Sequence, residues 1–176
     1  MSKGQYVYDY PRPMVTVDAL VFTIREGGLN VLLIKRKHDP WQGMWACPGG
    51  FVDLDETLEQ AAARELREET GVTGVPLVQF HTFGAVDRDP RGRVITVAYF
   101  GAADHRGLAP RGGDDAAEAA WLPVAGLPRL ASDHNLVVAT AVRTLRALLR
   151  AHESAPDWLP PTITKADLLQ ALDALP

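Results

Sequence analysis

The chain has 176 residues, of which 47% are hydrophobic and 23% charged, a composition typical of one globular domain or of one domain with a small appendage. A formal net charge of −4 argues against binding nucleic acid through its phosphates, although it is compatible with a small basic pocket for a phosphorylated metabolite. The single cysteine, Cys47, excludes an internal disulfide and a zinc site built from cysteines.

The chain lacks an apolar run of about 18 residues or more, and its N-terminal stretch MSKGQYVYDYPRP is polar, without the apolar centre of a signal peptide. We therefore expect a cytoplasmic protein that does not bind membranes. Residues 1–13 are interpreted as an N-terminal extension, residues 14–152 as the main domain, and residues 153–176 as a C-terminal tail with one short helix.

Strand-like segments open the main domain. Apolar and β-branched residues fill positions 14–24, and residues 31–37 are their expected partner across the turn residues 25–30. Residues 38–45 contain proline and glycine and are expected to form a loop, which leads into a short extended segment at 46–52.

A helix is predicted over residues 58–70, and both of its ends carry a sequence signal. Thr57 and Gln60 fit a capping box, and Gly71 suits the left-handed position that follows a last helical turn. The inward face is expected to carry small and apolar residues, with the glutamates on a different side. These inward residues are Ala62, Ala63, Leu66 and Thr70.

The following part of the chain is predicted to be strands and loops. Residues 75–86 and 93–103 form strand-like runs joined by the charged loop 87–93. A loop rich in glycine and acidic residues, at 107–119, then leads to a short strand around residues 119–124.

A long helix is predicted over residues 134–151, and a short amphipathic helix after the proline pair at 160–161. Strands around one helix, followed by a second helix, predict an α/β protein with a mixed sheet between helices. The expected buried stripe of the long helix is Leu136, Val137, Ala139, Val142, Leu145 and Leu149.

Three glutamates crowd one face of the helix predicted at 58–70. Glu65, Glu68 and Glu69 follow i, i+3 and i+4 spacing and fall within an arc of roughly 100°. A solvated surface is the ordinary interpretation of such a helix, but no cation four residues along offsets the Glu65–Glu69 repulsion. A Mg²⁺ ion would offset it, because Mg²⁺ prefers carboxylate oxygens and keeps waters for substrate phosphates. The preceding CPGG stretch permits a close approach of the backbone to a ligand.

A family resemblance follows from this segment. Gly50, five residues, Glu56, seven residues, and then RELREETGV over residues 64–72 match the Nudix box at every defined position. The chain resembles Nudix hydrolases over roughly residues 15–151. The resemblance implies the Nudix α/β/α sandwich, in which a mixed β-sheet lies between helices.

The resemblance implies a role for each matching residue. Arg64 would orient the glutamates, and Glu56 would support the site from behind. Metal ions held there would neutralise the charge of a diphosphate, lower the pKa of a bound water and hold the attacking and leaving oxygens in line. The metal is expected to be Mg²⁺, with Mn²⁺ as the alternative. The implied metal ligands are Gly50 through its carbonyl, Glu65, Glu68 and Glu69.

The general base stays open at this stage. In the family it is either a glutamate of the box or an acid on a later loop, and here Glu69 is the first candidate and Asp115 the second. Asp114 and Glu118 lie on the same loop, and a solvated acidic loop is the alternative interpretation of these acids. The implied catalytic residues are Glu69, Glu68, Asp115 and Arg64.

Residues 83–100 resemble the corresponding part of bacterial and archaeal ADP-ribose pyrophosphatases, and of the ADP-ribose-sensing domain of Nudix-related regulators of NAD metabolism. Arg88, Arg91 and Arg93 bring guanidinium groups that bind phosphate or ribose hydroxyls, helped by Asp87 and Asp89. A solvated connection between two strands is the alternative interpretation.

Other candidates for substrate contact lie nearer the N-terminus. Arg36 ends the second predicted strand, near where a substrate would cross the sheet. Trp41, Trp45 and Phe83 are suited to stack on adenine or, alternatively, to fill the core. The residues expected to bind substrate are Arg36, Arg88, Asp89, Arg91 and Trp45.

The resemblance implies hydrolysis of ADP-ribose to AMP and ribose 5-phosphate. One alternative is an ADP-ribose-binding sensor, because residues 159–175 resemble the start of the winged helix of the related regulators. The short tail and the intact box favour the enzyme. A second alternative is a pyrophosphatase that removes damaged nucleotides from the nucleotide pool.

The expected partner is a small-molecule nucleotide, with neither nucleic acid nor membrane. A homodimer is a further expectation, since dimeric members of the family exchange N-terminal segments. The five histidines show no ligand spacing and are interpreted as ordinary surface or loop residues. They are His38, His81, His105, His134 and His152.

Overall fold

The computed structural model describes residues 8–113 and 115–175. Within these residues, seven strands form one mixed sheet of order β3-β2-β1-β6-β5, with β4 paired to β1 and β7 paired to β2. The central pair, β1 (Met14–Arg25) and β6 (Val94–Ala102), is parallel, and the other pairs are antiparallel. The remaining strands are β2 (Gly28–Arg36), β3 (Trp45–Ala46), β4 (Gly49–Phe51), β5 (Val78–Phe83) and β7 (Ala116–Pro123), and a short 3₁₀ helix η1 spans His105–Gly107.

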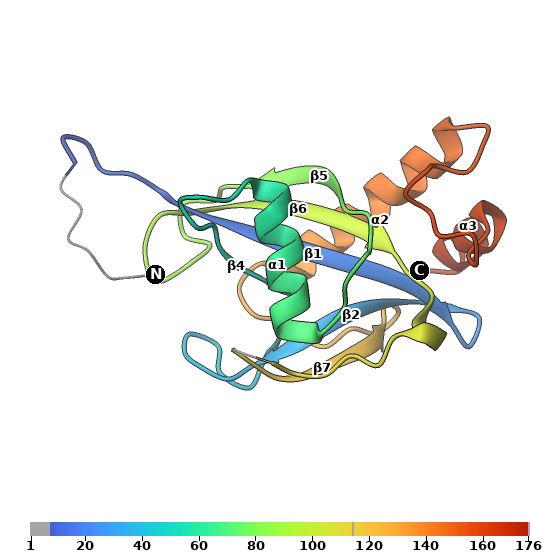
Figure 1. Cartoon of the computed structure of the whole chain (residues 1–176), viewed down its shortest axis with the longest axis horizontal. Coiled ribbons are helices and arrows are strands. Elements are labelled where there is room, and N and C mark those ends of the chain that lie inside the picture. Colours follow the sequence, from blue (N-terminus) through green and yellow to red (C-terminus); the bar gives the residue numbers. More distant parts are fainter. Residues whose placement is uncertain (1–7, 114, 176) are drawn as a thin grey trace.

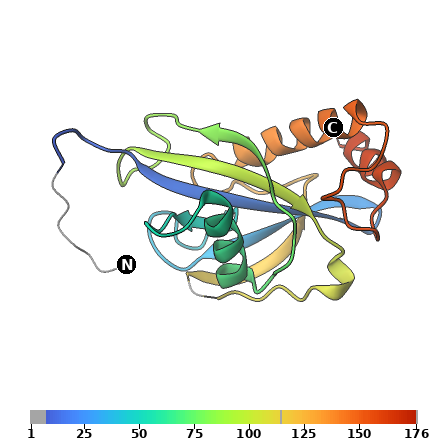
Figure 2. The same ribbon diagram turned by 45° about the horizontal axis from the view of Figure 1, so that its top comes forward.

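Helices cover both faces of the sheet. The helix α1 (Leu58–Thr70) lies on one face, and α2 (His134–Ala151) lies on the other with α3 (Lys165–Asp173) beside it (Figures 1 and 2). Because side chains alternate along a strand, β1 sends Leu20 and Phe22 into the apolar cluster under α2, and Val17 into the cluster under α1. The α/β class and the mixed sheet between helices are therefore confirmed.

The hairpin between β1 and β2 is tighter than predicted. Arg25 pairs with Gly28, so the loop consists of Glu26 and Gly27 alone. Both have positive φ, at 54° and 77°, which is typical of a type I′ turn. A glutamate in the left-handed region is uncommon, which is why the sequence predicted a longer turn.

The bounds of α1 agree with the prediction, because local signals determine both ends. Thr57 Oγ1 accepts from the Gln60 N–H at 3.3 Å, and Gln60 Oε1 accepts from the Thr57 N–H at 2.8 Å. Gly71 has a φ of 73° and its N–H bonds to the Arg67 carbonyl. Both cap predictions are confirmed.

The predicted inward face of α1 was wrong at two positions. Ala63 is exposed together with Glu59 and Arg67, which lie four residues to either side of it on the same flank of the helix. Glu69, expected on a different side from the core, is buried. The residues buried on α1 are Ala61, Ala62, Leu66, Glu69 and Thr70.

The bounds of α2 also agree with the prediction, but its buried stripe was wrong in part. Leu136 is 53% exposed and Ala139 is exposed as well. At 100° per residue these two lie on the same side as the exposed Arg143, away from the sheet. The residues buried on α2 are Val137, Val138, Ala141, Val142, Leu145 and Leu149.

The C-terminal segment packs on the core. Trp158 meets Phe100 edge to face, with 5.5 Å between ring centroids, and Leu168 and Leu172 of α3 belong to the apolar cluster under α2. The single short helix expected in the tail is α3, and it lies at the opposite end of the molecule from residues 8–13 (Figure 1).

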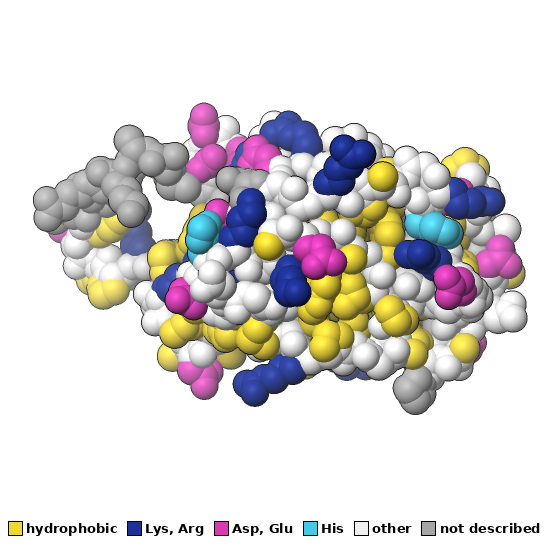
Figure 3. Space-filling model, turned by 90° about the horizontal axis from the view of Figure 1, so that it is seen from below, with side chains coloured by type: hydrophobic (Ala, Val, Ile, Leu, Met, Phe, Trp, Pro, Cys, Tyr) yellow, Lys and Arg dark blue, Asp and Glu magenta, His cyan; other side chains and the backbone are white. Residues whose placement is uncertain are grey.

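Charged side chains of both signs are interspersed on the face that Figure 3 shows. This distribution agrees with the modest net charge of −4. In the part of the chain that the structure describes, no helix is both long and apolar enough to cross a bilayer.

Candidate active site

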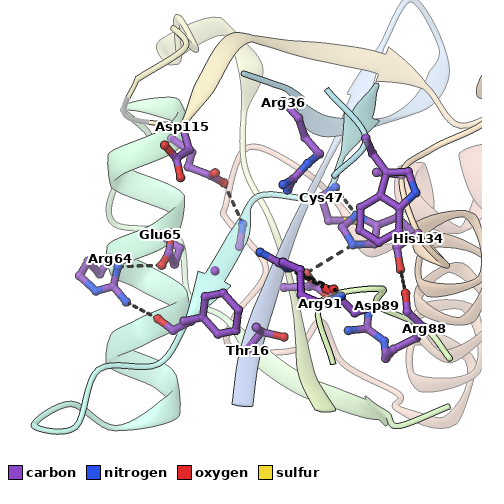
Figure 4. Close-up of a pocket in the computed structure, with 18 of the residues that line it drawn as sticks. Thr16, Arg36, Cys47, Arg64, Glu65, Arg88, Asp89, Arg91, Asp115 and His134 are labelled. Atoms are coloured by element: carbon purple, nitrogen blue, oxygen red, sulfur yellow. Dashed lines mark hydrogen bonds and ion pairs between the residues drawn. The ribbon is translucent and has the colours of Figure 1, made fainter. Parts of the chain in front are cut away.

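A pocket of about 460 Å³ lies between α1 and the start of α2. Arg64 and Glu65 of α1 line one side, and Arg88 and His134 line the opposite side (Figure 4). The pocket therefore joins the residues of the box to residues far from it in the sequence.

Two glycines of β4 bring its backbone against the acidic side of the pocket. A Cβ atom on Gly50 would lie 2.3 Å from Glu65 Oε1, and one on Gly49 would lie 2.1 Å from the Val17 carbonyl oxygen. The Gly49 N–H donates to Glu69 Oε2 at 2.8 Å. At Gly49 the obstacle to a Cβ is the backbone of β1, so glycine is required there. At Gly50 a Cβ would displace the Glu65 carboxylate, so the absence of a side chain lets this backbone approach the acid of α1.

Burial weakens the anionic form of the two glutamates that line the pocket. Desolvation raises the pKa of Glu65, and it raises the pKa of Glu69, which is 5% exposed, to about 8. A bound divalent cation would offset this penalty, because it supplies the positive charge that buried carboxylates need. Glu65, Glu69 and the Gly50 backbone therefore offer oxygen donors of the kind that suit a divalent cation.

Arg64 connects the acids of the box. Its Nη1 donates to Glu65 Oε1 at 2.8 Å and to Glu68 Oε2 at 3.2 Å. Its Nε and Nη2 hold Glu56 in a two-point contact at 2.9 and 2.6 Å, and Nη2 also bonds to the Phe51 carbonyl. Hydrogen bonding to Arg64 lowers the pKa of Glu56. Arg64 therefore makes the contacts expected of a residue that orients the glutamates, and Glu56 makes those expected of a residue that supports Arg64.

Glu68 lies beside the pocket and pairs with arginines. Besides Arg64, it accepts from Arg67 Nη2 at 2.8 Å. Across residues 8–113 and 115–175, no three histidine, cysteine or acidic side chains form a ready metal-binding cluster. Arg64 bonds to both Glu65 and Glu68 and so supplies positive charge to these two acids, whereas among the described residues it makes no such contact with Glu69.

The loop before β7 brings Asp115 to the pocket. The Gly113 N–H bonds to the Glu69 carbonyl at 3.3 Å, which ties this loop to the end of α1. The Asp115 side chain is 73% exposed and lies 3.6 Å from His38 Nε2. Glu118 points elsewhere and pairs with Lys35, and Asp114 falls outside the described residues.

Two arginines of the loop 87–93 line the pocket, and each is held by an acid. Arg88, 4% exposed, makes a two-point contact with Asp133 at 2.8 and 3.1 Å. Arg91 bonds to the buried Asp89 at 2.7 Å and lies over the Phe51 ring at 4.9 Å. The interpretation of this segment as a merely solvated connection is therefore excluded for Arg88 and Asp89.

Arg93 does not join the other two arginines. Its Nη1 donates to the Gly84 and Ala85 carbonyls and so holds the loop itself.

Arg36 does line the pocket, with its Nε bonded to the Pro40 carbonyl at 2.8 Å. Burial lowers the pKa of Arg36, while the nearby Glu69 raises it.

Trp41 and Phe51 line the pocket, where the prediction had selected Trp45. Trp45 lies in β3, packs against the apolar cluster under α2 and has the Lys35 ammonium 5.8 Å from its ring. Phe83 is buried in the same cluster. Trp41 lines the pocket from a loop position with a φ of 63°, a conformation that the sequence pattern does not reveal.

Two residues of the pocket were missed or misread. His134 was interpreted as an ordinary surface or loop residue, which is wrong, because its ring is buried and its Nδ1 accepts from the Cys47 N–H at 2.9 Å. Asp18 was not singled out, although it is the one charged residue in the apolar run 14–24. Asp18 is buried and accepts from Thr96 Oγ1 at 2.9 Å.

The chain is similar to known proteins over most of its length. Residues 13–141 match the family model of the NUDIX domain. The ADP-ribose pyrophosphatase of Methanocaldococcus jannaschii is 40% identical over 136 residues, which cover 76% of each chain. The ADPR responsive transcriptional repressor NtrR of Acinetobacter baylyi is 47% identical over 94 residues, or 52% of this chain and 38% of the repressor.

Solved structures show the same fold. The NUDIX domain of Shewanella oneidensis NrtR complexed with ADP ribose aligns with a TM-score of 0.72 and 35% identity, over 78% of this chain and 94% of that one. A Francisella tularensis bifunctional NMN adenylyltransferase/ADP ribose pyrophosphatase, complexed with AMP and a Mn ion, aligns with a TM-score of 0.67 and 28% identity, over 77% and 43% of the two chains. The match to the family model, together with the intact box, confirms the resemblance found in the sequence, and the chain belongs to the NUDIX family.

Proposed function

We propose that the protein is a pyrophosphatase that hydrolyses ADP-ribose to AMP and ribose 5-phosphate with the help of Mg²⁺, for which Mn²⁺ is the alternative. The observation that carries the proposal is one pocket lined by Glu65 and Glu69 on the side of α1 and by arginines elsewhere. Carboxylates suit a divalent cation and guanidinium groups suit phosphate, so the pocket offers both halves of a diphosphate site. The related pyrophosphatase and the NrtR domain that binds ADP ribose support this choice of ligand.

The metal would be held by the carboxylates of Glu65, Glu68 and Glu69 and by the Gly50 carbonyl. When bound, it would neutralise diphosphate charge and make a bound water more acidic. Arg64 orients Glu65 and Glu68 through its Nη1 group. Its contact with Glu56 would keep that orientation while ligands enter and leave.

The arginines would position the diphosphate. Arg36 has its side-chain hydrogen bond to the Pro40 carbonyl, which is neutral, so its charge stays available to a phosphate. Arg88 and Arg91 are each neutralised by an acid and would serve mainly as directed donors. Trp41 would stack on a flat group of the substrate.

Glu69 is the first candidate for the general base and Asp115 the second. The Gly49 N–H holds Glu69 Oε2 at 2.8 Å, so this carboxylate has a fixed direction in the pocket. Asp115 stands at the solvent side of the pocket, where a proton can leave to bulk water.

Direct product analysis tests the proposal. Wild-type protein with Mg²⁺ should convert ADP-ribose to AMP and ribose 5-phosphate, and a chelator should stop the reaction. Glu69→Gln should lower the rate by about 100-fold or more, as expected for loss of a ligand or base. Glu153→Gln removes the same charge from an exposed position of the tail and should leave the rate unchanged.

A ligand sensor is the second candidate, favoured by the similarity to NtrR and to NrtR. It requires ADP-ribose binding without turnover. The product analysis should also include oxidised dGTP as a substrate. Preferred hydrolysis of oxidised dGTP over ADP-ribose would support the removal of damaged nucleotides as the function.

A further inference from the structure

The side of the pocket opposite α1 holds a polar pair that the proposed hydrolysis does not use. Asp18 comes from β1 and lines the pocket. His134 comes from the first turn of α2 and lines it as well (Figure 4). Their side chains are only 7% and 12% exposed. Polar groups buried at this depth are normally matched by hydrogen-bond partners, so the partners of each atom indicate what is still free to bind.

The hydrogen bond to Cys47 determines the proton position on His134. A backbone N–H can only donate, so Nδ1, which accepts from the Cys47 N–H at 2.9 Å, carries no proton. The ring is therefore neutral with its proton on Nε2, and burial, which lowers the pKa of His134, acts in the same direction. Nε2–H is a donor with a fixed direction.

Asp18 supplies an acceptor opposite that donor. Its Oδ2 accepts from Thr96 Oγ1 at 2.9 Å and lies 3.9 Å from Arg88 Nη2. Its other oxygen, Oδ1, lies 3.9 Å from His134 Nε2. This gap is too long for a direct hydrogen bond, so a donor and an acceptor face the same part of the pocket unsatisfied by each other.

We infer that Asp18 and His134 select the adenine base of the nucleotide by its N7 and N6 edge. N7 accepts from His134 Nε2–H, and the N6 amino group donates to Asp18 Oδ1. This inference rests on the proposed function, because it orients ADP-ribose with adenine at α2 and the diphosphate at Glu65 and Glu69.

The same pair discriminates against other purines. Hypoxanthine and guanine carry an oxygen in place of the N6 amino group, so an acceptor would face the Asp18 carboxylate. Two acceptors in contact at a buried position leave both without a hydrogen bond. A sugar hydroxyl also donates and accepts hydrogen bonds, but if Asp18 and His134 bound a hydroxyl, affinity would not depend on which base the nucleotide carries.

Binding of ADP-ribose and of its hypoxanthine analogue tests the inference. Calorimetric titration of the full chain, with a chelator present to suppress hydrolysis, should show ADP-ribose bound roughly ten- to a hundred-fold more tightly. His134→Leu should weaken both ligands by a similar factor, because N7 is an acceptor in both purines, and His134→Gln, which keeps a donor, should restore part of the lost affinity. His152→Leu changes an exposed histidine at the end of α2 and should leave both affinities unchanged.

Asp18→Asn provides the sharper variant, because its amide can donate to the hypoxanthine oxygen. It should narrow or reverse the preference, whereas a purely structural role would weaken both ligands equally. If Asp18→Asn fails to fold, as judged by circular dichroism, the comparison of the two ligands on the wild type decides. Equal affinity of the wild type for both ligands, or a folded Asp18→Asn variant that leaves their ratio unchanged, would overturn the inference and assign the pair to a hydroxyl or a water. No ADP-ribose binding with or without Mg²⁺ would overturn the proposed function as well.

Discussion

The two sides of the pocket differ in what they offer a ligand. The side formed by α1 carries full charges, and Arg64 there is in direct contact with Glu65 and with Glu68. The side formed by β1 and α2 presents a neutral imidazole donor and a carboxylate acceptor, both buried. Charges act on a diphosphate whatever it is attached to, whereas a fixed donor and acceptor distinguish one group from another. The difference suggests that chemistry and selection are separated within one pocket, and variants of each side can test this separation.

The largest expected effect comes from removing the hydrogen-bond partner of the buried Arg88, on the side of the pocket formed by β1 and α2. Asp133→Ala removes both hydrogen bonds from Arg88, which is 4% exposed. Loss of one partner of a buried ion pair typically destabilises by about 3 kcal/mol or more. Chemical unfolding should show this drop, and Glu118→Ala, which breaks an exposed pair with Lys35, should change stability by less than about 1 kcal/mol. Equal losses would mean that Arg88 is not buried in solution.

A methyl group added at Gly50, on the side of the pocket formed by α1, should slow turnover without weakening the preference for adenine. In Gly50→Ala the new Cβ would lie 2.3 Å from Glu65 Oε1, so the carboxylate must move. Displacement of a reacting group by about 1 Å lowers rates about 100-fold, and we expect that loss in kcat. The control Gly107→Ala places its Cβ in open space. Full activity in Gly50→Ala would show that the position of Glu65 is not critical.

Breaking the network behind the acids should have a smaller effect. Arg64→Gln removes the contacts to Glu56 and Glu65. Mutation of a residue that orients metal ligands typically lowers metal affinity or activity by about 10- to 100-fold. We expect a loss of about 10-fold or more in kcat, together with a higher Mg²⁺ concentration for half-maximal rate. Arg67→Gln is the matched control, since Arg67 is exposed and contacts Glu68 alone among these acids. Equal Mg²⁺ dependence in both variants would contradict the orienting role of Arg64.

The smallest effect should come from the local signal that begins α1. Thr57→Ala removes the acceptor for the Gln60 N–H and should lower the free energy of unfolding by about 1 kcal/mol. Thr73→Ala, at an exposed position after the helix, should change it little. A thermal melt of both variants measures the difference. No destabilisation would mean that packing on the sheet alone determines where α1 begins.

These two sides also differ in how well the sequence predicts them. The bounds of α1 follow from its caps within a few residues, and the structure agrees with them. The other side is assembled from distant parts of the chain, and it depends on the pairing of β1 with β4 and with β6. Its residues are Asp18, Cys47, Thr96 and His134. Local patterns hold no information on such pairings, so His134 was misread as a surface residue.

Burial was predicted less well than the helices themselves. Leu136 is apolar but faces away from the sheet, and Glu69 is charged but buried, because the direction in which each helix packs decides which stripe is covered. Trp41 and Trp45 lie four residues apart in a loop and a strand, and only the backbone path determines which of them reaches the pocket.

The separation of chemistry from selection is tested most directly by the steady-state kinetics of one pair of variants on two substrates. Gly50→Ala and Asp18→Asn should be compared with the wild type on ADP-ribose and on its hypoxanthine analogue. The account predicts that Gly50→Ala lowers kcat for both substrates by the same factor, whereas Asp18→Asn raises KM for ADP-ribose relative to KM for the analogue. If Asp18→Asn instead lowers kcat equally for both substrates and leaves the ratio of their KM values unchanged, the two sides of the pocket act as one unit and the account is contradicted.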